Sequence, residues 1–120
     1  MSSSEELASF ISSSFRSVWA LELLLLLKRE GRACSTGELV ALMQASPAVV
    51  DTAITSLIAA GLTGIDGSGA VYLPSGREVA SLVEATEQLY RSHPDRVRRL
   101  IVASSNPGLT AFSNAFRLKD

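Results

Sequence analysis

The chain has 120 residues, of which 47% are apolar and 19% charged, with a formal net charge of −1. These values predict one globular domain and exclude a disordered chain. A nearly neutral chain has no general attraction for a polyanion, but its charges are unevenly distributed. Residues 1–32 hold four acids and four bases, residues 33–76 three acids and no base, and residues 77–120 five acids and seven bases.

Cysteine usage and hydropathy predict where the protein resides. The lone Cys34 cannot form an internal disulfide, which suits a reducing cytoplasm. The longest apolar run, residues 18–27, is interrupted by Glu22 and is too short to cross a bilayer. Residues 2–6 lack the basic start of a secretory signal. We therefore predict a cytoplasmic protein without membrane contact.

The N-terminal segment, residues 1–32, predicts two helices. The first is short and should loosen at the serines of residues 12–14. The second runs from about residue 15 to residue 30 and ends at Gly31. It is apolar nearly all round, which predicts burial on several sides, with Trp19 in the core and part of the helix in a subunit interface.

The middle segment, residues 35–74, predicts two short helices joined by a tight turn and followed by a two-stranded hairpin. Leu39, Leu42 and Met43 should face the core from the first helix, and residues 44–46 form the turn. The second helix spans residues 47–60. Inward positions recur along it at helical spacing, namely Val50, Ala53, Ile54 and Leu57. Strands at residues 62–65 and 70–73 flank an Asp-Gly-Ser-Gly hairpin turn.

The C-terminal segment, residues 75–120, predicts three further helices. The middle one, about residues 94–104, turns its arginines largely outward. The last one, residues 107–118, carries an apolar stripe. That stripe is either a final core helix, a dimer contact or a docking surface for a partner, and it consists of Leu109, Phe112 and Phe116.

Capping signals mark six helix starts. A serine followed three residues later by glutamate predicts a capping box at Ser3, Ser35 and Ser75. A capping side chain directly before a proline marks Ser46 and Asn106. Residues 92–95, Ser-His-Pro-Asp, are a sixth start of the same kind.

The run SPAVVDTAITSLIAAGLTGID, followed by a glycine turn and AVYLP, resembles the recognition helix and wing of bacterial winged-helix regulators of the MarR/ArsR-like type. Leu57, Ala60, Gly61 and Leu62 match the end of that family's recognition helix. The resemblance implies a mainly α fold with a small β-hairpin, a winged helix-turn-helix with additional N- and C-terminal helices. It also implies a homodimer that acts in transcriptional regulation, with the helix of residues 47–60 in the major groove of duplex DNA.

The outward positions of this helix differ from the family, in which they commonly hold basic or amide side chains. Here they hold no base, and Asp51 and Asp66 would oppose phosphates. Two functions therefore stay open: DNA binding by a weakly charged recognition helix with arginines from elsewhere, or a protein-interaction module that kept the fold and lost DNA binding. In either case the contacting residues would be Ala48, Val49, Thr52, Thr55, Ser56 and Ser68.

Four arginines gather around the turn between the two helices that follow the hairpin. They form either a phosphate-binding patch or a solvated face paired with Glu84, Glu87 and Asp95. The four are Arg91, Arg96, Arg98 and Arg99.

Catalytic chemistry has little support in the sequence. His93 lies at a helix start beside a proline, which favours capping over general-base catalysis. Cys34 is either a redox-sensing thiol, its pKa lowered by Arg32 and the helix start at Ser35, or a plain small residue. The sequence contains no Cys/His cluster of metal-ligand spacing and no glycine-rich phosphate loop. We predict no enzyme, no metal and no cofactor.

Overall fold

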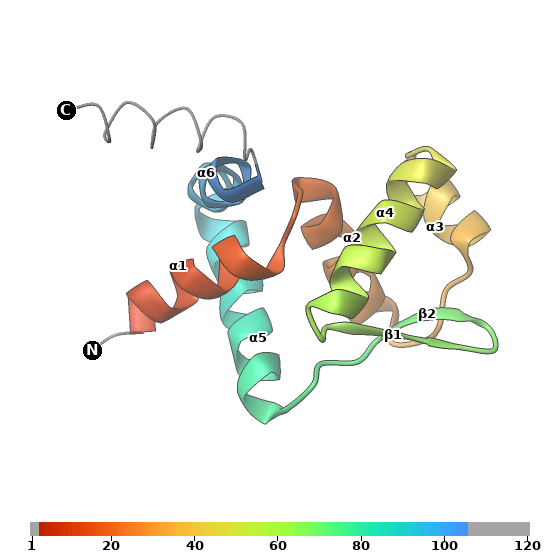
Figure 1. Ribbon diagram of the computed structural model, residues 1–120, viewed down its shortest axis with the longest axis horizontal. Coiled ribbons are helices and arrows are strands. Elements are labelled where there is room, and N and C mark those ends of the chain that lie inside the picture. Colours follow the sequence, from red (N-terminus) through yellow and green to blue (C-terminus); the bar gives the residue numbers. More distant parts are fainter. Residues whose placement is uncertain (1–2, 106–120) are drawn as a thin grey trace, which may run out of the picture.

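The computed structural model describes residues 3–105, and these form six helices and one antiparallel hairpin (Figure 1). The elements are α1 (Ser3–Ser14), α2 (Val18–Glu30), α3 (Thr36–Met43), α4 (Pro47–Ala59), β1 (Thr63–Asp66), β2 (Gly69–Tyr72), α5 (Arg77–Ser92) and α6 (Pro94–Ser105). The prediction of a mainly helical fold with a small hairpin is confirmed. The predicted helix at residues 107–118, its apolar stripe and the cap at Asn106 lie outside the described residues.

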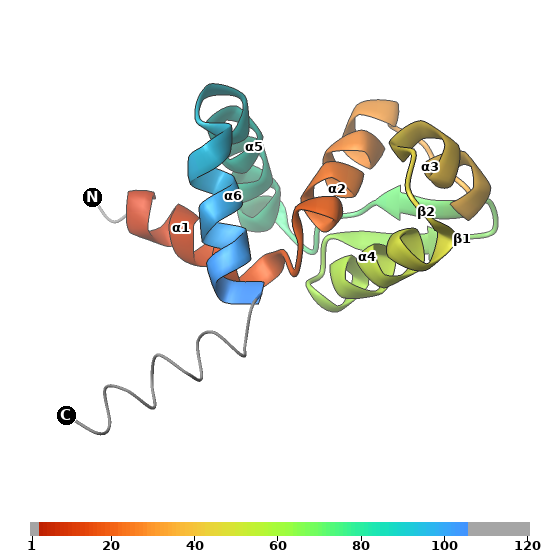
Figure 2. The same cartoon turned by 90° about the horizontal axis from the view of Figure 1, so that it is seen from above.

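The elements form two groups that are separate in both Figure 1 and Figure 2. The helical lobe consists of α1, α5 and α6, in which α1 packs against both other helices. The hairpin lobe consists of α2, α3, α4, β1 and β2, in which α2 packs against α4 and β2. The chain direction changes by 103° between α1 and α2. These two helices belong to different lobes because they pack against different elements.

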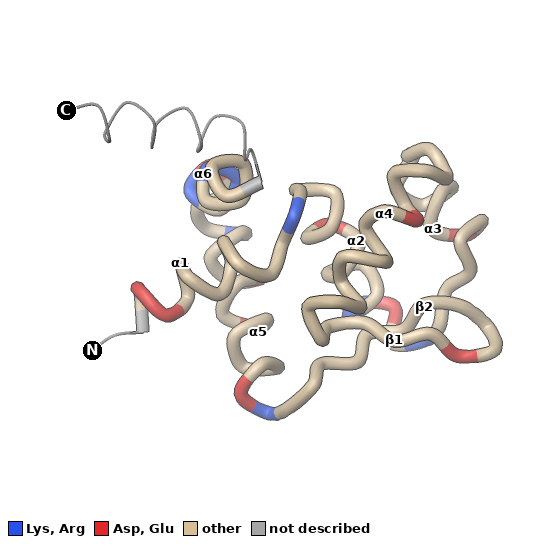
Figure 3. Tube along the Cα trace, in the orientation of Figure 1, with Lys and Arg blue, Asp and Glu red and all other residues tan. Residues whose placement is uncertain are grey.

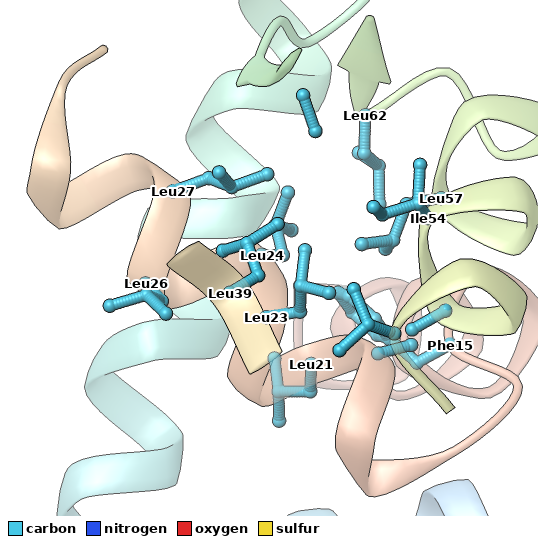
Figure 4. Close-up of a cluster of buried hydrophobic side chains, with 14 of the residues drawn as sticks. Phe15, Leu21, Leu23, Leu24, Leu26, Leu27, Leu39, Ile54, Leu57 and Leu62 are labelled. Atoms are coloured by element: carbon cyan, nitrogen blue, oxygen red, sulfur yellow. The ribbon is translucent and has the colours of Figure 1, made fainter. Parts of the chain in front are cut away.

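The core is built around α2, as Figure 4 shows. Leucines 21, 23, 24 and 27 are fully buried there, together with Leu39 from α3 and Leu57 from α4. The predicted start of α2 at residue 15 was three residues too early. The helix begins at Val18 because Ser17 caps it, its hydroxyl accepting from the Ala20 amide at 3.1 Å. Phe15 is buried in the connection, edge-on to Phe10 at a ring distance of 5.9 Å.

Two side chains that were expected in the core are exposed. Trp19 on α2 is 44% exposed and Leu42 on α3 is 52% exposed. Both predictions were wrong because α3 and α5 meet this side of α2 at its edges and leave a groove between them. Leu39 is fully buried and Met43 is half-buried, as expected of the inward face of α3.

Both strands of the hairpin are shifted by one residue from their predicted positions. The first strand begins and ends one residue later, and the second begins and ends one residue earlier. Its register pairs Thr63 with Tyr72 and Asp66 with Gly69. The other edge of β2 meets Cys34, whose amide donates to the Ala70 carbonyl at 2.8 Å and whose carbonyl accepts from the Ala70 amide at 2.9 Å. Gly69 has φ +142°, and a Cβ there would lie 2.2 Å from the Cys34 carbonyl oxygen. The hairpin is therefore anchored to the segment before α3.

Capping explains where α3 and α4 begin. Ser35 and Glu38 form the complete predicted capping box, and the Ser46 hydroxyl accepts from the Val49 amide at 3.2 Å. The predicted box at Ser75 is wrong. There α5 starts after Gly76 without a side-chain cap, because the Ser75 amide instead donates to the Gly61 carbonyl at the base of the hairpin, at 2.8 Å.

The start of α6 is at Pro94, as predicted, but Ser92 does not cap it. The Ser92 hydroxyl donates to the carbonyls of Gln88 and Leu89, within α5, at 3.1 and 3.3 Å. His93 is the C-cap of α5, its amide donating to the Leu89 carbonyl at 2.7 Å. The Ser92 hydroxyl and the His93 amide in this turn therefore both bond to carbonyls of α5.

Candidate functional site

The outer face of α4 opens into a hollow between the two lobes. Its inner face is buried through Val50 and Leu57, and positions on the opposite side line a space of about 850 Å³. The end of α1, the connection to α2 and the end of α6 form the other wall. We call this space the Arg16 hollow, and its lining residues are Ser12, Ser13, Arg16, Asp51, Thr52, Thr55, Ser56, Ala59 and Ser104.

Hydroxyl groups dominate the lining of the Arg16 hollow. Ser56 donates to the Ala53 carbonyl at 2.9 Å, and Ser13 donates to the Phe10 carbonyl at 3.3 Å, so both keep lone pairs free to accept. Among the described residues, Arg16 is the only base in the lining and Asp51 the only acid. Arg16 is exposed and forms no ion pair within residues 3–105. It therefore offers an unpaired guanidinium beside α4.

The predicted contact residues on α4 come together only in part. Thr52, Thr55 and Ser56 all line the Arg16 hollow. Ala48 is exposed near the start of α4 but does not line the hollow, and Val49, expected to be exposed, is half-buried. Ser68 lies at the exposed hairpin tip, where its amide donates to the Asp66 carboxylate at 2.7 Å. The hairpin tip and α4 thus present separate contact surfaces.

The four arginines predicted as one cluster are divided between two sides of the helical lobe. Arg91 pairs with Glu87 at 3.4 Å. Arg98 pairs with Asp95 at 3.2 Å and lies over the Tyr90 ring, 5.5 Å from its centroid. Arg96 and Arg99 instead line a second hollow beside α1. Arg91 and Arg98 thus form ion pairs of the second interpretation, with Glu87 and Asp95, whereas Arg96 and Arg99 lie apart from them because successive positions on α6 point in different directions. Phosphate binding by these arginines stays a prediction.

Arg16 was not singled out from the sequence. Figure 3 shows basic positions in the connection between α1 and α2 and on α6, whereas α4 carries none. The available signal was a lone base two residues after the serines of residues 12–14, and it became informative only when the fold placed it beside α4. Sequence reasoning missed it because α4 begins more than thirty residues later.

A groove of about 710 Å³ lies between α2, α3 and α5, and we call it the Trp19 groove. Exposed Trp19 and Leu42 are part of its lining. Its charged groups are largely paired: Lys28 bonds to Glu87 at 2.9 Å, and the Tyr90 hydroxyl donates to Glu22. The hydrogen bond to Glu87 raises the pKa of Lys28 above its usual value. The full lining is Val18, Trp19, Glu22, Leu25, Leu26, Lys28, Arg29, Leu42, Met43, Glu87, Tyr90 and Arg91.

Cys34 does not have the properties of a reactive thiol. The residue is fully buried, and burial raises the pKa of its thiol more than the nearby Arg32 lowers it. Arg32 itself is engaged by Glu38 at 2.9 Å and Glu30 at 3.2 Å. Of the two interpretations of Cys34, its burial favours the plain small residue, because the segment before α3 packs under the hairpin rather than facing solvent.

Residues 3–105 contain no group of three or more His, Cys, Asp or Glu side chains that could hold a metal ion. His93 is exposed, with its Nδ1 2.9 Å from the Ser92 hydroxyl oxygen. No single helix in this part of the chain is long and apolar enough to span a membrane, although two bent pairs, α1 with α2 and α3 with α4, meet the length and composition criteria together.

Comparison with known proteins gives no match: neither a protein-family model, nor a curated protein, nor a solved structure is significantly similar to this chain.

Proposed function

We propose that this protein is a winged helix-turn-helix DNA-binding protein that acts in transcriptional regulation, with α4 as its recognition helix. Residues 44–46 join α3 to α4, and the chain direction changes by 111° between them. Helix-turn-helix motifs join two helices at about 90–120° through a turn of three or four residues. An antiparallel hairpin follows α4 directly, in the position of a wing.

The observation that supports this function best is the exposed polar face of α4 beside Arg16. A helix about 10–12 Å in diameter fits the major groove of B-DNA, which is about 12 Å wide. Thr52, Thr55 and Ser56 can then contact base edges or phosphates. Because α4 lacks any base, Arg16 supplies the positive charge that displaces counterions from the phosphates.

The same surface limits the strength of binding. Asp51 lies in the hollow with Arg16 and would repel the backbone that Arg16 attracts. One protomer should therefore bind duplex weakly and with a shallow salt dependence. A homodimer would compensate by placing two recognition helices one helical turn of DNA apart, about 34–36 Å.

Fluorescence anisotropy with a labelled random duplex, measured along a salt series, tests this function. Arg16→Gln should weaken binding and reduce the slope of log K against log salt by about 0.9, the value for one lost phosphate contact. Asp51→Asn should strengthen binding, because it removes a like charge from the interface. Arg77→Gln is the matched control, since Arg77 is exposed at the start of α5 and lines neither hollow. Absence of binding by the wild-type chain at low ionic strength would overturn the proposal.

A second candidate, protein interaction, is favoured by the Trp19 groove. Its exposed Trp19 and Leu42 are the kinds of apolar side chain that protein interfaces bury at their centre. Trp19 is the only tryptophan in the chain, so its fluorescence reports directly on this groove. A blue shift of its emission as protein concentration rises, absent in a Leu42→Glu variant, would show that a second copy covers it. An emission maximum independent of concentration would exclude self-association through this surface.

A further inference from the structure

A second hollow, which we call the Arg99 hollow, lies beside the Arg16 hollow along the ends of α1 and α6. It has a volume of about 520 Å³. Both hollows include Ser12 and Ser104 in their linings, so they adjoin at these residues. The lining of the Arg99 hollow is Ser12, Arg96, Arg99, Leu100, Ala103 and Ser104.

The two arginines of this hollow lie on one side of α6. Residues three apart on a helix are neighbours, with their Cβ atoms about 5–6 Å apart. Arg98 belongs to the opposite flank, where it contacts Asp95 and Tyr90. Arg96 and Arg99 are therefore neighbours in one hollow, which Ser12 of α1 also lines.

The charge of the Arg99 hollow is not neutralised within the described residues. Its lining contains no acid, and neither Arg96 nor Arg99 forms an ion pair within residues 3–105. Arg32, Arg91 and Arg98, by contrast, are all paired with carboxylates. An exposed pair of arginines without a carboxylate partner favours an external anion, and the guanidinium fork matches phosphate geometry.

We propose that Arg96 and Arg99 bind phosphates of the DNA backbone that flanks the segment contacted by α4. The inference rests on the proposed function, and it extends the footprint of one protomer from α4 across Arg16 to α6. A DNA strand carries one charge per about 3.4 Å of helix axis, so two neighbouring arginines can engage successive phosphates of one strand. The contacts are to the backbone, so they add affinity without sequence preference.

Salt dependence of binding to the random duplex tests this extension, using the full chain and the double variant Arg96→Gln/Arg99→Gln. Two lost phosphate contacts should reduce the slope of log K against log salt by about 1.8. The matched control is Arg32→Gln/Arg77→Gln, which removes the same charge from two exposed arginines that line neither hollow and do not line the Trp19 groove. Circular dichroism melting establishes that both double variants fold.

Each result decides between distinct conclusions. A reduced slope in the Arg96/Arg99 variant, with the control unchanged, supports the extended footprint. An unchanged slope in that variant, while the wild type binds and Arg16→Gln weakens binding, overturns the extension and leaves the proposed function in place. Equal reductions of the slope in both double variants would mean that the total charge of the protein sets the affinity for DNA, whatever the position of the arginines. This result would also overturn the extended footprint. If the wild-type chain does not bind duplex at all, the proposed function and the extension fail together.

Discussion

The Arg16 hollow and the Trp19 groove are of similar size, about 850 and 710 Å³, but of opposite chemistry. The hollow holds hydroxyl groups and a guanidinium without an ion-pair partner in the described residues. The groove exposes a tryptophan and a leucine, and its lysine is paired with Glu87. A base without a partner attracts an external anion, whereas paired charges beside exposed apolar groups suit a protein surface. This difference is the reason for proposing two separate interaction surfaces rather than one.

The largest expected effect on stability tests whether the Trp19 groove is exposed to solvent. Leu24→Ala removes a fully buried side chain and should reduce the free energy of unfolding by about 3 kcal/mol. The identical change at half-exposed Leu42 should cost less than about 1 kcal/mol. Urea denaturation at low protein concentration measures both. Similar costs for the two variants would show that the groove is covered in solution.

A smaller effect concerns the helices that form the two surfaces, since α4 lines the hollow and α5 lines the groove. Ser46→Ala removes the N-cap of α4 and should reduce the free energy of unfolding by about 1 kcal/mol. Ser75→Ala, two residues before α5, removes no cap and should stay within about 0.5 kcal/mol. Thermal melts of the two variants give the comparison. A larger loss at Ser75 than at Ser46 would contradict the observed helix starts.

The smallest effect concerns the ion pair in the Trp19 groove. Because the pKa of Lys28 is raised in the folded state, its contribution to stability is fully present below pH 10.5 and is lost as the pH rises through the raised value. Lys28→Met should reduce the free energy of unfolding by about 0.5 kcal/mol at pH 7. The difference between wild type and variant should shrink above pH 10.5, as followed by urea denaturation at several pH values. A difference that is constant with pH would assign the effect to packing of the lysine stem.

Much of the fold could be predicted because its signals are local. The capping box of Ser35 with Glu38, the proline after Ser46 and the left-handed Gly31 each act within a few residues of the chain. The Asp-Gly-Ser-Gly turn signal likewise placed both strands to within one residue. Such features depend on backbone hydrogen bonds between near neighbours, so no knowledge of the packing is needed to read them.

The candidate site was only partly predictable, since its parts come from distant segments. The polar outer face of α4 could be read from helical periodicity, with Thr52, Thr55 and Ser56 on it. The position of Arg16 beside that face, and the separation of Arg96 and Arg99 from Arg91 and Arg98, depend on how α1 and α6 pack.

By itself the sequence determined the helices, the hairpin and an α4 without a basic residue, because hydrogen bonds between near neighbours and the spacing of apolar residues specify them. Only the tertiary structure decided the exposure of Trp19, the burial of Cys34 under the hairpin and the position of Arg16 beside α4. The physical reason is that burial and charge pairing are set by neighbours in space. For Cys34 that neighbour is Ala70, and for Arg16 it is the outer face of α4.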